Sequence, residues 1–364
     1  AAVLAARGNG AARDPLATFV VPLVATTRPA TRFHEVDFVS PEGLTPMVHV
    51  PSILAGRDGR LLAAWYGGSK EGARDVRLFV ASRESAPGAA WSPPRVALTA
   101  GTASALLGRP VRKLGNAVLF SAGAGRVGLL FVSAFMGWST SSLNVATSSD
   151  GGESFSFARR LVLSPFLNVS ELAKNAPATL SDGSLAFPIY HDLLGKSAEI
   201  LWLALDGEGR LATASKTRIA SGRAAMQPAL VPLSPRDALA FLRDESGDDR
   251  LRVARTSDGG RTWSSPEPTG LPCPRSGLDA LRLPDGRVLV AFNDGKDRSS
   301  LSLAVSADEG RSFGRRVIVE RESGAELSYP FLEMAPDGVV HLVYTWKRAR
   351  IRHVAFDAEW LEAP

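Results

Sequence analysis

A short motif occurs three times in this 364-residue chain, and its repetition constrains the fold more than any other feature of the sequence. The copies are Ser148-x-Asp150-x-Gly152-x-Ser154-Phe155, Thr256-x-Asp258-x-Gly260-x-Thr262-Trp263 and Ser306-x-Asp308-x-Gly310-x-Ser312-Phe313. They are spaced by about 50 residues or by twice that. In such a motif the Asp side chain accepts hydrogen bonds from backbone N–H groups, the Gly adopts a positive φ, and the aromatic residue covers a sheet edge. The motif therefore predicts a hairpin turn at a fixed place in a repeated unit.

A second repeat, a turn followed by an apolar strand, alternates with the first. It occurs at Asp58-Gly59, Gly123–Gly125, Asp182-Gly183, Pro235–Asp237, Asp285-Gly286 and Asp337-Gly338. Six units of about 50 to 66 residues, each with room for four antiparallel strands, predict an all-β, six-bladed β-propeller. No helical periodicity extends beyond two turns, which excludes alternating strand-and-helix architectures.

The ends of the repeated region predict how the ring closes. The last unit supplies only three strands, near Ser328–Met334, Val339–Trp346 and Ile351–Phe356. Arg32–Val39 alternates like a strand and precedes the first complete unit. We expect it to add the fourth strand to the last blade, because this leaves no open sheet edge. Residues 31–364 then form the propeller, and residues 1–30 form an N-terminal arm outside the ring.

Charge and cysteine content exclude several classes of function. The chain has 42 Lys+Arg and 37 Asp+Glu, a net charge of +5, but its basic residues are scattered singly or in pairs. This distribution does not predict a nucleic-acid partner. Cys273 is the only thiol, so neither an intrachain disulfide nor a Cys-based zinc site can form. The sequence predicts no metal site and no cofactor.

The N-terminal region bears on localisation. Its longest apolar stretch, Leu16–Ala25, is interrupted by Pro22 and is too short to span a bilayer. The chain opens Ala-Ala-Val-Leu without a methionine. This start fits a removed leader and export to the periplasm or medium, and it equally fits a shortened chain.

With this period, the motif resembles the Asp box of the bacterial sialidase (neuraminidase) superfamily of BNR-repeat propellers. The resemblance covers roughly residues 32 to 360. Asp boxes lie on the outer rim and also occur in binding and sorting propellers, so function must be argued from the site. In that family three arginines on the axis hold the substrate carboxylate, a Tyr paired with a Glu is the nucleophile, and an Asp is the acid/base. Guanidinium groups suit this task because they bind carboxylates in a bidentate fashion.

The resemblance assigns roles to residues of this chain. Arg243, at the end of the strand ALAFLR, matches the second arginine, and Arg298, eight residues before Ser306, matches the third. Tyr329 falls at the nucleophile position. The acid/base position falls in the Gly-rich loop after the first hairpin, where Asp75 is the favoured match and Glu71 the second.

Three positions depart from the family pattern. His49 of His49-Val50-Pro51 stands at the first arginine, and Thr345 stands at the Glu that braces that arginine. Losing both charges is self-consistent, because neither is well tolerated without the other. Gln227, 16 residues before Arg243, stands at the Glu that activates the tyrosine. Since an amide cannot take the phenol proton, we expect a rebuilt site in which Gln227 orients Tyr329.

Further axis-facing candidates follow the innermost strands. They are Tyr190, His191, Lys174, Asn175, Asn116, Arg275, Trp346 and Lys347, and of these Tyr190, His191 and Lys174 are predicted, with His49, to bind substrate.

The first hypothesis is a sialidase-like exo-glycosidase that acts on a terminal acidic sugar of a glycan. The second is a polysaccharide lyase that cleaves a uronate-containing glycan by β-elimination, with His49 or His191 and Tyr329 transferring protons. The third is a non-catalytic propeller that binds acidic glycans. All three predict an acidic carbohydrate as the partner.

Overall fold

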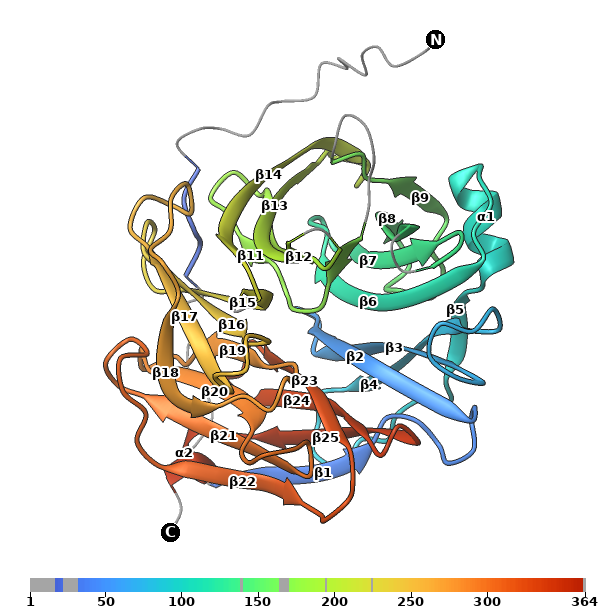
Figure 1. Ribbon diagram of the computed structural model, residues 1–364. Helices are drawn as coiled ribbons and strands as arrows, with labels where there is room; N and C mark the ends of the chain where they lie inside the picture. Colours follow the sequence, from blue (N-terminus) through green and yellow to red (C-terminus); the bar gives the residue numbers. More distant parts are fainter. Residues whose placement is uncertain are drawn as a thin grey trace.

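The computed structural model describes residues 17–21, 32–137, 140–163, 170–193, 195–223 and 225–362. These residues form six antiparallel sheets arranged as blades around a central axis (Figure 1). The structure confirms the predicted six-bladed, all-β propeller. No described helix is both long and apolar enough to cross a membrane. Nor do the described residues include a cluster of three or more His, Cys, Asp or Glu side chains that could hold a metal ion.

The first three blades follow one another along the chain. Blade 1 contains β2 (Met47–Ala55), β3 (Arg60–Gly68), β4 (Arg77–Glu84) and β5 (Arg95–Leu98). Blade 2 contains β6 (Lys113–Ser121), β7 (Val127–Ala134), β8 (Ser142–Ser148) and β9 (Phe157–Arg160). Blade 3 contains β10 (Glu171–Ala173), β11 (Ala178–Thr179), β12 (Leu185–His191), β13 (Ser197–Leu205) and β14 (Leu211–Ser221).

The last three blades complete the ring. Blade 4 contains β15 (Met226–Pro232), β16 (Ala238–Arg243), β17 (Arg250–Thr256) and β18 (Glu267–Pro272). Blade 5 contains β19 (Asp279–Arg282), β20 (Val288–Asn293), β21 (Ser300–Ser306) and β22 (Arg316–Arg321). Blade 6 contains β23 (Leu327–Met334), β24 (Val340–Trp346), β25 (Arg350–Phe356) and the N-terminal β1 (His34–Phe38).

Strand β1 closes blade 6 as predicted. It pairs antiparallel with β25, in a register that runs from His34 opposite Phe356 to Phe38 opposite Arg352. Glu35 of β1 also forms an ion pair with Arg83 of blade 1, with an N–O distance of 2.9 Å. The N-terminal strand therefore pairs with the C-terminal one and contacts the first blade as well.

Among the described residues two short helices lie outside the blades, and the sequence pattern does not predict them. Helix α1 (Ala100–Leu107) follows blade 1 and begins with a capping box between Thr99 and Thr102. It ends at Gly108, whose φ of 61° is left-handed. Helix α2 (Ala358–Glu362) follows blade 6.

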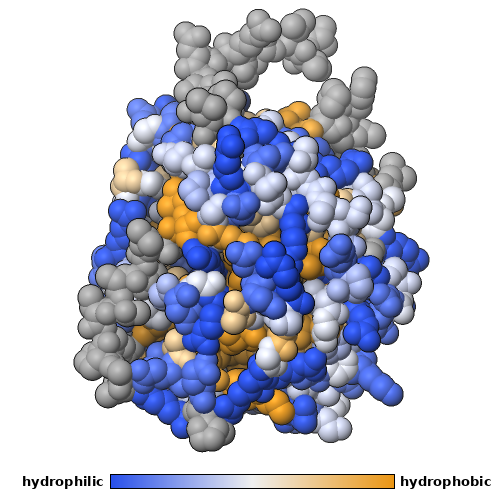
Figure 2. All heavy atoms as spheres, turned by 90° about the vertical axis from the view of Figure 1, so that its left-hand side faces the viewer, coloured by the Kyte–Doolittle hydropathy of each residue, from blue (hydrophilic) through white to orange (hydrophobic). Residues whose placement is uncertain are grey.

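Part of the predicted N-terminal arm packs against the ring. Phe19 forms a β-bridge with Leu180 of blade 3, and its N–H donates to the carbonyl of Pro235 in blade 4 at 3.0 Å. Its ring is buried in a cluster that includes Trp202. This segment runs along the side of the ring at the left of Figure 1, the side that Figure 2 faces, where bands of hydrophobic surface alternate with hydrophilic ones. Residues 1–16 and 22–31 lie outside the described residues.

The repeated turns have the hydrogen bonds expected of capped hairpins. Asp258 accepts from the Thr256 hydroxyl at 2.8 Å and from the Thr262 N–H at 3.0 Å. Burial alone would raise the pKa of Asp258, but the bonds from Thr262 and Thr256 outweigh it and lower the pKa to about 2. Gly260 has a φ of 81°, and a Cβ there would approach the Trp202 ring to 3.0 Å. The turn therefore needs both the carboxylate and the glycine.

Four innermost strands carry a β-bulge at an equivalent place. In β2, β6, β15 and β23 two residues lie opposite one residue of the neighbouring strand. The first bulge residue is Val50, Gln227 or Tyr329 in three of them, with φ of 48°, 44° and 55°. Each also precedes a proline. A positive φ is costly for residues other than glycine, and strained residues of this kind cluster at functional sites.

Polar side chains of the innermost strands tie neighbouring blades together. Asn116 Nδ2 donates to the Ala173 carbonyl, and Asn175 Nδ2 to the Pro228 carbonyl, both at 2.9 Å. The Asp279 carboxylate accepts from the Leu332 N–H at 2.8 Å, and the Glu333 carboxylate from the Ala55 N–H at 3.3 Å. Each bond joins one blade to the next, so these side chains hold the ring closed.

Lys174 is the most deeply buried charge in this region. Its ammonium donates to Asn175 Oδ1 at 2.6 Å, to the Leu278 carbonyl at 2.7 Å and to the Pro330 carbonyl. Burial lowers the pKa of Lys174, and it raises the pKa of neighbouring Asp279. Two of its three acceptors, the Leu278 and Pro330 carbonyls, therefore connect blade 3 to blades 5 and 6.

Candidate functional site

The site lies at the end of the ring where the second strand of each blade ends. Arg243 ends β16 and pairs in register with Met226, which precedes the bulge residue Gln227. Gln227 Oε1 accepts from Arg243 Nη1 at 3.1 Å, and its Nε2 donates to the Tyr190 hydroxyl at 3.2 Å. Glu245 pairs with the other terminal nitrogen of Arg243 at 2.7 Å. The amide thus uses both its donor and its acceptor, which a carboxylate could not do.

Tyr329 lies between a histidine and an arginine. Its ring meets His49 edge to face, with centroids 4.7 Å apart and planes at 82°. The Arg298 guanidinium carbon lies 5.7 Å from the ring centroid. A Cβ at Gly277 would be 3.0 Å from Tyr329 Cδ1 and 3.4 Å from Gln227 Oε1, so the missing side chain lets the two groups approach. The predicted site residues of blades 1, 4 and 6 therefore do come together.

His49 is fully buried and neutral. Its Nδ1 lies 3.1 Å from the Thr345 hydroxyl, which also accepts from the Val50 N–H at 3.0 Å. Its Nε2 is buried and has no hydrogen-bond partner among the described residues. Burial lowers the pKa of His49 to about 3, and the positive charges of Arg348 and Arg298 act in the same direction. The contact joins the two residues that the sequence analysis matched to an Arg–Glu pair.

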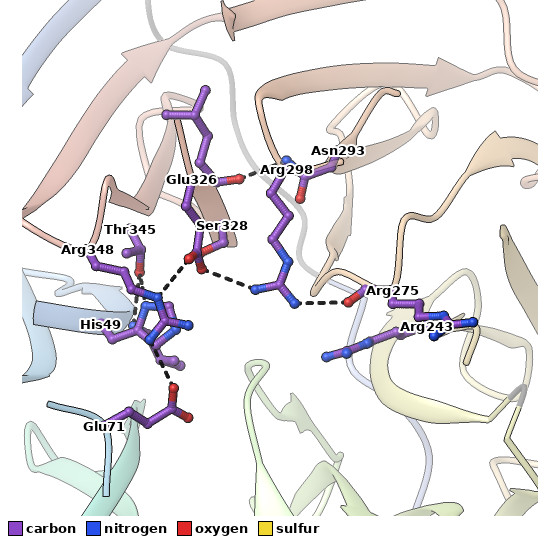
Figure 3. Close-up of polar contacts among 12 residues, drawn as sticks. His49, Glu71, Arg243, Arg275, Asn293, Arg298, Glu326, Ser328, Thr345 and Arg348 are labelled. Carbon is purple, nitrogen blue, oxygen red and sulfur yellow. Dashed lines mark hydrogen bonds and ion pairs between the residues drawn. The ribbon is translucent and has the colours of Figure 1, made fainter. Parts of the chain in front are cut away.

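The cluster also contains Glu326 and Arg348, which the sequence analysis did not predict. Glu326 Oε1 pairs with Arg298 at 3.1 Å, and its Oε2 pairs with Arg348 Nε at 2.7 Å (Figure 3). The Ser328 hydroxyl donates to the same carboxylate at 2.8 Å. Burial alone would raise the pKa of Glu326, but the bonds from Arg348 and Ser328 outweigh it and lower the pKa to about 2. The available signal was the position of Arg348, next to the candidate Lys347 in the last hairpin turn.

The loop between β3 and β4 supplies two carboxylates in different settings. Glu71 Oε2 forms an ion pair with Arg348 Nη1 at 3.0 Å. Asp75 is exposed and accepts from the Ser69 N–H at 2.8 Å and from its hydroxyl at 2.9 Å. These bonds lower the pKa of Asp75. Glu71 therefore contacts Arg348, whereas Asp75 braces the base of its own loop.

The remaining candidates lie at different depths. Tyr190 is buried, and burial followed by the proximity of Tyr329 raises its pKa. His191 is partly exposed, and its Nδ1 accepts from the Leu193 N–H at 3.1 Å. Lys174 is fully buried, and its ammonium already has three acceptors. Tyr190 thus belongs to the cluster around Gln227. His191 forms its hydrogen bond within its own loop, and Lys174 links neighbouring blades.

Figure 3 shows how the charged groups face one another. The guanidinium groups of Arg243, Arg298 and Arg348 extend into one opening, and Glu71 lies across from the hairpin that carries Arg348. Arg298 is steadied by the Arg275 carbonyl, which accepts from its Nη2 at 3.0 Å. Such an opening suits an anion such as a carboxylate, with a phenol and a neutral imidazole at its edge.

A family model, the BNR repeat-like domain, matches residues 59–342. The chain belongs to this family. Among solved structures, this BNR repeat-like protein is similar to the Hadza microbial sialidase Hz136, with a TM-score of 0.74 and 20% identity over 89% of this chain and 68% of that one. It is also similar to the intramolecular trans-sialidase from Ruminococcus gnavus, with a TM-score of 0.69 and 14% identity over 87% and 96% of the two chains. No curated protein matches it.

A protein of unknown function from Dyadobacter fermentans has the same fold, with a TM-score of 0.68 and 17% identity over 93% of this chain and all of that one. At these identities the likeness shows a sialidase-like propeller fold. Substrate and reaction depend on the residues at the mouth of the ring.

Proposed function

We propose that this BNR repeat-like protein is a sialidase-type exo-glycosidase that removes a terminal, carboxylate-bearing sugar from a glycan. The observation that carries the proposal is that Arg298 lies over the Tyr329 ring, while Gln227, which accepts from Arg243, lies next to Gly277 as the same ring does. Two guanidinium forks hold a carboxylate by charge-assisted hydrogen bonds, and the phenol then lies beside the sugar ring. Binding through the carboxylate selects acidic sugars.

The chain's own groups can carry the remaining steps of hydrolysis. Tyr329 stabilises, through its phenol oxygen, the positive charge that develops at the anomeric carbon as the glycosidic bond breaks. The loop between β3 and β4 carries the candidates for the acid that protonates the leaving oxygen. Glu71 lies beside Arg348, whereas Asp75, the match favoured by the sequence, accepts two bonds from Ser69 that favour its deprotonated form. Water then supplies a hydroxyl to the anomeric carbon and returns a proton to that acid. Gln227 positions Arg243 and Tyr190 around this reaction.

A second candidate, a lyase, is favoured by the state of His49. Its imidazole is neutral, and its Nε2 has no hydrogen-bond partner among the described residues. The burial that keeps it neutral also makes it a weaker base than a free imidazole, so proton transfer to it relies on the arginines that stabilise the product. In this reaction His49 takes the proton α to a uronate carboxylate, and the arginines stabilise the resulting enolate. A C–C double bond then forms as the glycosidic C–O bond breaks, and Tyr329 donates a proton to the leaving oxygen.

One experiment separates the possible functions. The protein is incubated with a panel of sialosides and uronate-containing glycans, and the products are weighed by mass spectrometry. Hydrolysis adds one water to the summed product masses, whereas elimination adds none and leaves an unsaturated uronate. Arg298→Gln and Tyr329→Phe serve as controls that should abolish either product. Saturable binding without turnover would identify a binding propeller, and no binding at all would refute an acidic-glycan function.

A further inference from the structure

Arg348 and Arg298 share one carboxylate, which fixes their guanidinium groups side by side. Glu326 contacts Arg298 with one oxygen and Arg348 with the other, at 3.1 and 2.7 Å. The Arg348 carbonyl also accepts from the Val48 N–H at 2.8 Å, so its hairpin lies against the strand that carries His49. Arg348 therefore reaches the site from blade 6, beside a blade 1 position where the histidine is buried and uncharged.

Glu71 places a second carboxylate on Arg348. The ion pair spans 3.0 Å, and the two side chains keep exposed fractions of 35% (Arg348) and 43% (Glu71). Glu71 therefore meets both the guanidinium and solvent at the mouth of the ring (Figure 3). Together, Arg298 and Arg348 carry two positive charges against the two negative charges of Glu326 and Glu71.

Glu326 and Glu71 differ in how firmly they are held. Glu326 accepts from two arginines and from the Ser328 hydroxyl, whereas Glu71 forms its ion pair with Arg348 alone among the described residues. An exposed ion pair such as Glu71–Arg348 contributes little free energy. Replacing Glu71 on Arg348 by the carboxylate of a ligand therefore needs little free energy. The exchange also leaves the net charge of the cluster unchanged, because one carboxylate replaces another.

We propose that Arg348 is a third carboxylate-binding arginine and that Glu71 is a resident carboxylate which the carboxylate of the substrate displaces. This inference rests on the proposed function, since it concerns how an acidic sugar enters the same site. It makes Arg348 a specificity-determining residue and Glu71 a competitor that lowers affinity for every acidic ligand. Once displaced, Glu71 is also released beside the bound sugar.

The test measures binding of N-acetylneuraminate and of galacturonate by isothermal titration calorimetry, each beside its methyl ester. Glu71→Gln should bind the acids about two- to five-fold more tightly, the worth of one exposed ion pair, with no change for the esters. Arg348→Gln should weaken acid binding by about ten-fold or more. In the double variant, Glu71→Gln should bring no gain, because the cation for which it competes is gone.

The same hairpin offers a matched control. Lys347 and Glu322 form an ion pair with exposed fractions of 32% and 45%, almost those of Arg348 and Glu71. Glu322→Gln removes the same charge and should leave acid binding unchanged. An equal gain from Glu322→Gln, or a gain from Glu71→Gln that persists without Arg348, would overturn the inference in favour of a general charge effect.

Two further readouts keep the outcomes distinct. Thermal unfolding checks that Arg348→Gln is folded, and Arg348→Lys, which keeps the charge but loses the planar fork, replaces it if it is not. If no probe binds to the wild type or to Glu71→Gln, the proposed function itself fails. If the acids bind and Arg298→Gln weakens them while changes at Glu71 and Arg348 have no effect, only the present inference fails.

Discussion

Replacing His49 by glutamine should remove a large part of the pH dependence of folding stability below neutrality. In the folded protein the pKa of His49 is lowered to about 3, from an ordinary value of 6.5. The unfolded chain therefore takes up a proton below pH 6.5, while the folded protein does not. The stabilisation is complete above pH 6.5 and is lost progressively as the pH falls toward 3.

The magnitude follows from these two pKa values. Each unit between the folded and unfolded pKa is worth about 1.4 kcal/mol, but only the part of the shift that has been titrated counts at a given pH. Between pH 7 and pH 5, His49 alone should lower the free energy of unfolding by about 2 kcal/mol. A glutamine can still contact the Thr345 hydroxyl but does not titrate, so this contribution should disappear.

The assay is urea denaturation followed by tryptophan fluorescence at pH 7 and pH 5, for the wild type and for His49→Gln. The difference between their free energies of unfolding should change by about 2 kcal/mol between the two pH values. His191→Gln, on a partly exposed histidine, controls for the loss of an imidazole. Parallel pH dependence of wild type and His49→Gln would refute the assignment of His49 as a neutral, buried base.

Three further predictions test the packing around the site. Gly277→Ala places a Cβ 3.0 Å from Tyr329 Cδ1, so it should lower kcat/KM in steady-state assays although it removes no polar group; unchanged kinetics would argue against close packing there. Lys174→Met leaves the Leu278 and Pro330 carbonyls and Asp279 without their cation, so it should lower the free energy of unfolding, measured by chemical denaturation, by about 3 kcal/mol. An unchanged free energy of unfolding would show that Lys174 does not hold the blades together. Asp258→Ala removes the cap of its turn and should cost about 1 kcal/mol by the same assay, with little effect on ligand binding.

The ring could be predicted from the sequence because its turns repeat at a fixed period. Turn signals such as Asp285-Gly286 fix where a strand must start, and the next copy of the motif fixes where the blade ends. The closing strand followed from counting strands in the last unit. The helix Ala100–Leu107 was not predicted, because two helical turns are too short to show a clear apolar periodicity in the sequence.

The site was predictable only where a residue's place follows from strand position. Arg243 and Tyr329 end or begin strands set by the repeat, so their convergence follows from the ring. Arg348 and Glu326 lie outside the strands, and their contacts depend on long side chains that reach between blades. Lys174 was expected to bind substrate, but the sequence does not reveal how far down the axis a residue lies, and its ammonium is saturated by ties between blades.

The bulges of the innermost strands give this propeller equivalent backbone positions that carry different side chains in different blades. Val50, Gln227 and Tyr329 occupy the same rung of three sheets, each followed by a proline and flanked by intact pairing. The bulge is formed by the backbone and is kept whichever side chain it carries, while the side chains of Gln227 and Tyr329 contact residues of neighbouring blades. The side chain at this position can therefore differ from blade to blade, as valine, glutamine and tyrosine do here, while the bulge and the flanking strand pairing are kept.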